Sequence, residues 1–475
     1  MKNRLAFGAV VVLCLTLAQA AWGQWSSDPS KNLALSDQLN SDQVQPKVKP
    51  LPNNQWFVSW FNADANDPQP AGYDVYLQLL DATGVEQFPH DGNRVATLTN
   101  SSTEDYGLDI DVGGNALLAF LDTREGRNQQ ITAAKMDASG NAVWGPNGVQ
   151  LTHDGVAHFA PKIVGTSDGG VVVAWTASWG SHVNVKVQKL DPNGNPVWRE
   201  PVVFHDPTLQ YFLSDMHASD SGSVIVSWVE EDGFFSNHQL RANKISAAGK
   251  KMWGKDNVVI FDAGSLQFGN FPYFVSDGSG GAVFGWYTSS PALQCFAQHI
   301  RADGSEAFPH NGSPGSTDMN NIRVAPSVSY SAATDETFLF WTEEDSNQFF
   351  NGVSGQKFNG SGVAQWAPTG VVLVPLGDDT QTFVENVQSG SNSLVFWIDS
   401  PGFGQSTMEA TTVDGNGNTV CAEFPVSTAT SDKYGSSLDI APSGLAALAW
   451  ADDRTGNNGI YIQNVNSDCS LGQAK

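Results

Sequence analysis

The chain repeats itself with a period of about 55 residues along almost its whole length. An apolar segment that ends in Trp or Phe recurs every 53 to 60 residues, and a glycine in a turn-like segment recurs every 54 to 58 residues. The aromatic positions are Trp60, Phe120, Trp175, Trp228, Trp286, Trp341, Trp397 and Trp450. The turn glycines are Gly84, Gly140, Gly194, Gly249, Gly304, Gly362, Gly417 and Gly472. Two unrelated markers with the same period predict eight copies of one supersecondary unit.

Residues 158–206 show what one copy folds into. Four β-type segments, at 161–165, 171–175, 184–190 and 198–204, alternate with turns at 167–170 and 191–194. Both turns end in glycine, which supplies the positive φ that tight turns require. No segment of helical period lies between the units, so a parallel α/β fold is not expected. The sequence therefore predicts an all-β fold, a single eight-bladed β-propeller with four antiparallel strands in each blade.

The two ends of the chain predict how the ring closes. The eighth unit stops soon after Gly472 and has no fourth β-type segment. Near the other end, Trp25 and the apolar segment 32–35 resemble the fourth segments that begin at Trp144, Trp253 and Trp366. We therefore expect the N-terminal strand to complete the last blade, which would leave no open sheet edge at the junction.

Residues 1–20 have the pattern of a secretory signal peptide. Lys2 and Arg4 precede an apolar run at 5–17, and Ala18 and Ala20 form a small-residue cleavage pattern. The run is too short to span a bilayer, so we expect a secreted or periplasmic protein without membrane insertion, whose residues 21–475 form the propeller. We also expect a monomer.

The chain is strongly acidic. Its formal net charge is -25, and removal of residues 1–20 with their two positive charges makes it -27. This charge disfavours nucleic acid and anionic lipid as partners and favours cations, basic proteins or neutral sugars. Solubility outside the cell explains the same composition without any partner.

A second aromatic lies four residues after most turn glycines. These residues, Phe88, Trp144, Trp198, Trp253, Phe308 and Trp366, are predicted to dock between neighbouring blades. Cys421 takes this position in the seventh unit, and Cys469 lies in the matching turn of the eighth. We predict a Cys421–Cys469 disulfide that replaces aromatic docking, while Cys295, within a third segment, is expected to be a buried free thiol.

The turn from Asp191 to Trp198, repeated at 137–144, resembles the tryptophan-docking repeat of quinoprotein dehydrogenases, which are also eight-bladed propellers. The resemblance covers only the turn and fourth strand of each unit. In that family a threonine precedes the glycine and the Asp-to-Gly spacing is one residue longer than at 191–194, and this chain has no adjacent cysteine pair. The whole repeat also resembles those of secreted bacterial repeat propellers without assigned activity. The quinoprotein resemblance implies a quinone-type redox enzyme as one candidate function.

Five units carry a carboxylate two residues after the strand-ending aromatic. They are Asp122, Glu230, Glu343, Asp399 and Asp452, and Arg124 and Arg454 follow two of them. These acids either cap hairpins and pair with nearby arginines, or form a ring at the channel mouth that binds calcium or a basic partner. No loop has the ligand spacing of an EF-hand, so no cofactor is expected except possible calcium.

His153 and His205 follow the fourth segments of neighbouring units, and each precedes an aspartate. They could meet on one face as metal ligands or a general base, or could serve ordinary turn chemistry. No His-Glu-x-x-His and no Cys-x-x-Cys motif occurs. Regular repeats without a catalytic motif favour a noncatalytic propeller that binds a cell-surface protein or polysaccharide. The alternatives are a polysaccharide-processing lyase or hydrolase, with a site on the loop face, and the quinone-type enzyme.

Overall fold

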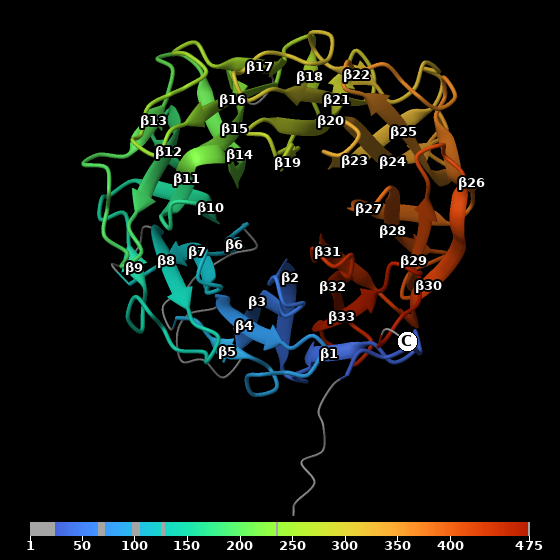
Figure 1. Cartoon of the computed structure of the whole chain (residues 1–475), viewed down its shortest axis with the longest axis horizontal. Coiled ribbons are helices and arrows are strands. Elements are labelled where there is room, and N and C mark those ends of the chain that lie inside the picture. Colours follow the sequence, from blue (N-terminus) through green and yellow to red (C-terminus); the bar gives the residue numbers. More distant parts are fainter. Residues whose placement is uncertain (1–23, 65–71, 97–104, 125–128, 234–235, 474–475) are drawn as a thin grey trace, which may run out of the picture.

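The computed structural model describes residues 24–64, 72–96, 105–124, 129–233 and 236–473. These residues form eight antiparallel sheets, and Figure 1 shows the sheets arranged as blades around an open centre. The prediction of an eight-bladed β-propeller is confirmed. The only helical element among the described residues is a three-residue 3-10 turn, Asp220–Gly222.

Each blade is a meander that runs from an inner strand at the channel to an outer strand at the rim. The first blade consists of β2 (Ser41–Pro50), β3 (Trp56–Asp64), β4 (Asp74–Leu80) and β5 (Asn93–Arg94), and the second of β6 (Gly107–Ile110), β7 (Ala116–Asp122), β8 (Gln130–Met136) and β9 (Val149–Gln150). The third consists of β10 (Ala157–Gly165), β11 (Val171–Trp179), β12 (His182–Leu190) and β13 (Val202–Phe204), the fourth of β14 (Gln210–Ala218), β15 (Val224–Glu231), β16 (Gln239–Ile245) and β17 (Val258–Phe261), and the fifth of β18 (Ser265–Leu266), β19 (Phe274–Ser276), β20 (Ala282–Ser290), β21 (Cys295–Ile300) and β22 (Ser313–Pro314). The sixth consists of β23 (Ile322–Ser331), β24 (Glu336–Glu344), β25 (Asn351–Asn359) and β26 (Val371–Gly377), the seventh of β27 (Thr380–Ser389), β28 (Asn392–Ser400), β29 (Ser406–Val413) and β30 (Thr419–Ser431), and the eighth of β31 (Lys433–Ile440), β32 (Ala446–Asp452), β33 (Gly459–Val465) and β1 (Leu33–Ser36).

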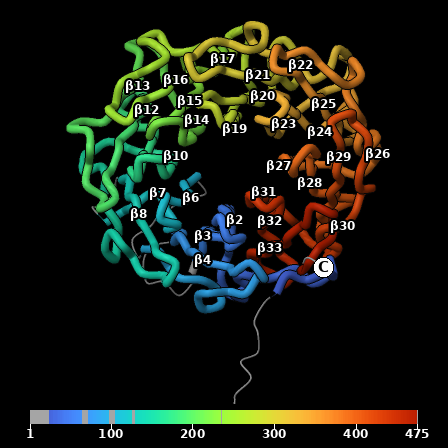
Figure 2. Tube along the Cα trace, viewed as in Figure 1, coloured from blue at the N-terminus to red at the C-terminus, as the bar shows by residue number. Residues whose placement is uncertain are grey.

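The ring closes as predicted. The N-terminal strand β1 pairs antiparallel with β33 and completes the eighth blade. Figure 2 shows the blue start of the described chain beside the red strands of this last blade. Trp25, just before β1, donates from its indole Nε1 to the carbonyl of Ala82 in the first blade at 3.1 Å. The N-terminal segment therefore contacts the blades on both sides of the junction.

The hydrophobic core lies between blades. All eight strand-ending aromatics are at most 1% exposed. The buried clusters combine side chains of neighbouring blades; for example, Trp60 of the first blade packs in one cluster with Ala449 and Ile462 of the eighth. Each sheet thus covers the face of the next, as a radial repeat requires.

The docking aromatics lie at the blade interfaces. Trp144, Trp198, Trp253 and Trp366 each donate an indole N–H to a backbone carbonyl in the next blade's turn, at 3.0 to 3.2 Å. The carbonyl belongs to the residue two positions before the turn glycine. Gly304, with φ of 88°, shows why glycine is required: a Cβ there would lie 2.8 Å from the Trp253 ring.

The structure corrects one predicted strand. The fourth strand of the third blade begins at Val202 instead of Trp198. The side chain of Gln188 donates to the Trp198 carbonyl at 3.2 Å, so this backbone group is not available to a sheet ladder. At the equivalent place in other blades, Gln298 and Gln356 bind the other backbone group and accept from the N–H of Phe308 and Trp366, both at 3.1 Å. A second correction concerns the fifth blade, whose inner strand is split into β18 and β19.

Between the seventh and eighth blades, a pair of cysteines takes the place of the docking aromatic. Cys421 and Cys469 form the predicted disulfide, which joins the seventh and eighth blades. By loop entropy such a link over 48 residues contributes about 3 to 4 kcal/mol. Cys295 is buried and free, as predicted, and burial raises the pKa of its thiol.

Among the described residues, no helix has the length and apolarity needed to span a bilayer. The predicted signal peptide, residues 1–20, lies outside the described residues. Secretion stays a prediction, and so does the monomeric state.

We expect the stabilisation that Trp253 provides at its blade interface to have two measurable contributions, one from packing of the ring and one from the indole hydrogen bond. We expect Trp253→Phe to lower the free energy of unfolding by about 1 kcal/mol, because it removes the indole hydrogen bond but keeps a ring. Trp253→Ala should lower it by about 3 to 5 kcal/mol. Urea unfolding would measure both. Met252→Ala, at the exposed neighbouring position, is the control and should change stability by less than about 0.5 kcal/mol. Equal losses in the two Trp253 variants would contradict this division.

Candidate functional site

The two faces of the ring carry different connections. One face, here called the loop face, carries the loops between second and third strands and between blades; the other, the turn face, carries the tight turns. The carboxylates predicted after the strand-ending aromatics lie at the loop-face ends of the second strands. Asp122 accepts from the Nε of Arg124 at 2.5 Å, and Glu230 accepts from the Nε of Arg241 at 2.7 Å. Both carboxylates are buried.

Two of these acids also satisfy the buried tryptophans. Glu343 accepts from the indole Nε1 of Trp341 at 2.9 Å, and Asp452 accepts from that of Trp450 at 3.0 Å. The equivalent indole nitrogens of four other blades, in Trp60, Trp175, Trp228 and Trp286, are buried without a hydrogen-bond partner. A buried donor without an acceptor destabilises the fold, so an acid at this position has a structural use.

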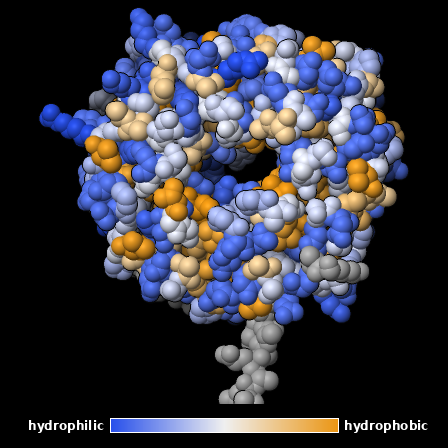
Figure 3. Space-filling model, viewed as in Figure 1, coloured by the Kyte–Doolittle hydropathy of each residue, from blue (hydrophilic) through white to orange (hydrophobic). Residues whose placement is uncertain are grey.

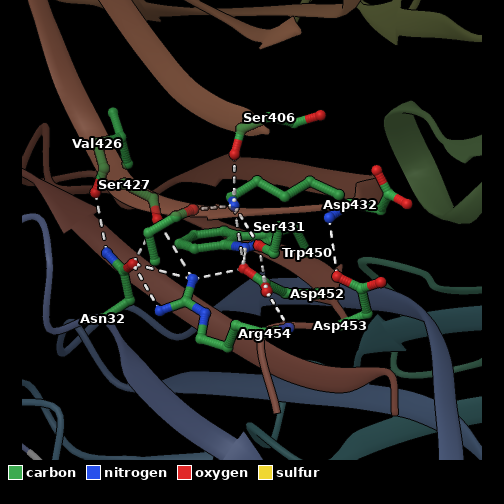
Figure 4. A network of polar contacts seen from close by, with 12 residues as sticks. Asn32, Ser406, Val426, Ser427, Ser431, Asp432, Trp450, Asp452, Asp453 and Arg454 are labelled. Atoms are coloured by element: carbon green, nitrogen blue, oxygen red, sulfur yellow. Dashed lines mark hydrogen bonds and ion pairs between the residues drawn. The ribbon is translucent and has the colours of Figure 1, made fainter. Parts of the chain in front are cut away.

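Asp452 is the centre of the most extensive of these networks (Figure 4). It accepts from Arg454 at 2.5 Å and from Ser431 at 2.6 Å, and Lys433 lies 3.3 Å away. Arg454 also donates to Asn32, just before the closing strand β1. Burial disfavours the Asp452 carboxylate, but Arg454 and Lys433 outweigh it and lower its pKa from 3.8 to about 2. The network therefore ties the closing strand to its blade.

The other predicted site residues do not form one cluster. Asp399 is half-buried and accepts from Gln381 at 2.5 Å, and burial raises the pKa of its carboxyl. His153 and His205 are exposed in the loops after β9 and β13. Next to His205, Asp206 accepts from the backbone N–H of Thr208 at 2.8 Å, which is ordinary turn chemistry. A binding role for these residues, with or without calcium, stays a prediction.

Sequence reasoning predicted the inner strands, which surround the channel (Figure 1), but placed no site residue on them and missed their bulges. The centre remains open when all side chains are drawn (Figure 3). Six inner strands contain a register shift, for example between Val44 and Lys47 in β2 and between Phe159 and Lys162 in β10. Gln45-Pro46 and Ala160-Pro161 lie at these two bulges, where proline's missing N–H is tolerated. The proline is the sequence signal that could have found them.

Nine ionisable side chains on or next to these inner strands form what we call the channel cluster. Its members come from six blades and are Lys47, Lys49, Asp105, Asp109, Lys162, Asp215, His217, Glu385 and Asp439. Asp105, just before β6, joins the lysines of two neighbouring blades: it pairs with Lys47 at 2.7 Å and with Lys162. Lys49 pairs with Asp439 at 3.0 Å, and His217 with Asp215 at 3.0 Å.

The cluster shifts its carboxyl pKa values in opposite directions. Burial raises the pKa of Glu385 to about 7, although Ser436 donates to the carboxyl. Burial also raises the pKa of Asp109, which Lys49 only partly offsets. For Asp105, burial is outweighed by Lys162 and Lys47, which hold its pKa well below the usual range. Glu385 is therefore partly protonated at neutral pH, while Asp105 is ionised.

Exposed aromatic side chains are the second feature that sequence reasoning missed. Among the described residues, eight are exposed, all on or near the loop face. Seven of them belong to three consecutive blades, the fifth to the seventh, and are here called the aromatic patch: Phe268, Phe271, Tyr273, Phe349, Phe350, Phe383 and Phe403. The Lys162 ammonium lies 5.0 Å from the centre of the Tyr273 ring, so the patch adjoins the channel cluster.

Asp37, His90 and Asp91 place possible metal-ligand atoms within 4.8 Å of one another. The imidazole lies 3.1 Å from Glu86 and 3.3 Å from Asp37. The hydrogen bond to Glu86, with those carboxylates around it, raises the pKa of His90 to about 9. A metal ion that used this imidazole would have to displace its proton, so binding there would depend on pH.

No family model and no curated protein matches the sequence. Solved structures do match. An ulvan lyase of a new polysaccharide lyase family has a TM-score of 0.48 at 10% identity, with 92% of this chain and 98% of that chain covered. Polysaccharide lyase Uly1 has a TM-score of 0.46 at 11% identity, with 94% of each chain covered. A protein of unknown function from Dyadobacter fermentans has a TM-score of 0.41 at 7% identity, with 92% and 98% covered. Similarity at this level transfers no activity to this chain.

The Asp452 network gives a test of ring closure. We expect Asp452→Asn to lower the free energy of unfolding at pH 7 by roughly 3 to 5 kcal/mol, because it leaves buried cations unpaired. In the wild type, the lowered pKa contributes roughly 2 kcal/mol, which is complete above about pH 4 and lost as the pH falls toward 2. Urea unfolding from pH 7 to pH 2 measures both effects. Exposed Glu423→Gln is the control, with an expected change under about 0.5 kcal/mol. A small loss in Asp452→Asn would show that the network does not hold the junction.

Proposed function

We propose that the chain is a polysaccharide-processing enzyme, a hydrolase or lyase, with the channel cluster as its acid and base. The observation that carries this proposal is the gathering of nine ionisable side chains around an open channel. Glycoside hydrolysis needs one protonated and one ionised carboxyl group. Elimination needs a base and a cation. The cluster contains all of these groups, with pKa values shifted apart as in known acid and base pairs.

The fold itself does not require these groups. In each of these blades, one residue of the inner strand pairs with the second-strand residue that comes just before the strand-ending aromatic, so these inner residues are equivalent. It carries Lys47, Lys162, Asp215 and Glu385 in four blades, but Gly107, Ser327 and Ser437 in three others. Because small residues serve at the same place in the ring, the ionisable ones support a role beyond folding.

A noncatalytic polysaccharide binder is the second candidate, and the aromatic patch favours it. Exposed apolar groups gathered on one face mark an interaction site. The quinone-type enzyme finds no comparable support. The docking tryptophans that motivated it are mostly buried between blades, and their indoles bond to backbone carbonyls.

Glu385 is the group we expect to donate the proton. Glu385→Gln should lower kcat on a cleaved polysaccharide by about 10²- to 10⁴-fold, because the amide cannot transfer a proton. In the wild type, activity should fall as the pH rises through about 7, where Glu385 loses its proton. The measurement is turnover on a polysaccharide panel, by reducing ends and by the ultraviolet absorbance of unsaturated products.

Glu409→Gln is the matched control. Burial raises the pKa of Glu409 to about 7 as well, but this residue is on β29, the third strand of the same blade, and not at the channel. Its kcat should stay within about twofold of the wild type. Binding of a polysaccharide without turnover in the wild type would support the noncatalytic candidate instead.

A further inference from the structure

The exposed apolar residues of the two faces differ in kind. On the turn face, the exposed large apolar side chains among the described residues are aliphatic: Val112, Val143, Val197, Met252, Val363 and Val420. The exposed aromatic side chains of the described ranges are all associated with the loop face, where the aliphatic Leu39 and Met319 are exposed too. The turn face thus has exposed aliphatic groups but no exposed ring among the described residues, so the aromatic patch needs a specific explanation.

The patch is built from three irregular segments and one bulge. Residues 267–273 interrupt the inner edge of the fifth blade, between β18 and β19, and present three of the rings. Phe349 and Phe350 lie in the loop between β24 and β25, and Phe403, 95% exposed, lies between β28 and β29. Phe383 occupies the bulge of β27 with a φ of 51°, two residues before Glu385. The rings thus extend from the loop tips to the channel cluster.

Amides and glycines flank these rings within the three segments, while Lys162 of the channel cluster contacts Tyr273 and His238 packs edge-on against Phe268. The three segments, residues 265–273, 345–351 and 400–406, contain Gln267, Asn270, Asn347, Gln348, Asn351 and Gln405. They contain no Lys, Arg or His, and their one charged residue is Asp345. Amide groups can both donate and accept hydrogen bonds with hydroxyl groups. An anionic ligand would find no cation within these three segments and would meet a chain of net charge -25.

We propose that the aromatic patch binds a neutral polysaccharide chain, laid across the fifth to seventh blades and leading to the channel. The C–H faces of pyranose rings pack on aromatic rings, while sugar hydroxyls bond to the flanking amides. This inference rests on the proposed function and narrows it. Elimination requires a carboxylate next to the carbon that loses its proton, which a neutral sugar lacks. The reaction is then hydrolysis: the glycosidic C–O bond breaks, the anomeric carbon gains hydroxyl from water, and the leaving oxygen gains a proton.

Affinity gel electrophoresis of the full chain tests the patch without requiring turnover. The probes are neutral polymers, glucomannan, arabinoxylan and mixed-linkage β-glucan, and the anionic polymers polygalacturonate and dextran sulfate. We expect the wild type to bind at least one neutral polymer and neither anionic one. Phe403→Ala and Phe349→Ala should each weaken binding about 3- to 10-fold, and the double variant more than either, because each loses a stacked ring.

Val363→Ala and Val197→Ala are the matched controls, since both remove exposed apolar groups from the turn face, and their affinities should be unchanged. Binding only to the anionic polymers, equal binding by patch and control variants, or no polymer binding would each overturn the inference. If the patch variants bind normally but the wild type still cleaves, the patch fails and the processing function stands. If the wild type binds neutral polymers through the patch but cleaves none, the processing function fails and the patch stands.

Discussion

The structure depends on the contact between a docking aromatic and the turn glycine of the next blade. This contact joins packing, a hydrogen bond and a backbone requirement at one place. Trp253 packs where any side chain at Gly304 would collide, and it also bonds to the Ala302 carbonyl at 3.0 Å. Since each blade contacts its neighbours mainly, a ring must repeat such a joint at nearly every interface. A fixed spacing of turn, aromatic and strand follows from this need, which is why the period in the sequence is so regular.

The ring closes within the eighth blade, where two neighbouring strands, β1 and β33, come from near the two ends of the chain and no loop joins one to the other. Additional contacts of the N-terminal segment hold this junction together. Trp25 repeats the docking contact across the junction, β1 pairs with β33, and Asn32 bonds to Arg454. The neighbouring interface has the Cys421–Cys469 disulfide in place of an aromatic. Loss of the terminal segment would expose a strand edge and a buried ion pair together, so these bonds restrain the part of the ring that is most open to fraying.

The sequence predicted the parts of the molecule that repeat and missed most of the parts that do not. Blade number, ring closure and the disulfide followed from markers that must recur because every interface obeys the same sterics. The beginning of the fourth strand was wrong, because a distant side chain, Gln188, takes the Trp198 carbonyl. Lys49, Asp109 and His217 were missed because the residues at these inner positions differ between blades and are far apart in the sequence. A comparison of the repeats finds only positions that carry the same kind of residue in most blades. The acids that the period did reveal, such as Asp452, lie in buried pairs.

The features that repeat and those that differ between blades lie on different strands, because the repeating contacts are made by particular strands of each blade. The docking contacts and the strand-ending aromatics recur on the outer and middle strands, whereas one equivalent inner position carries residues as different as Lys47, Ser327 and Glu385. Inner positions and loop tips can therefore vary without loss of the ring. They have varied in two directions: six blades contribute ionisable groups to the channel, while the fifth to seventh present aromatic rings. The seventh blade carries both, with Phe383 and Glu385 on one strand, so a ligand laid over the rings and entering the channel there would meet the acid that we expect to act on it.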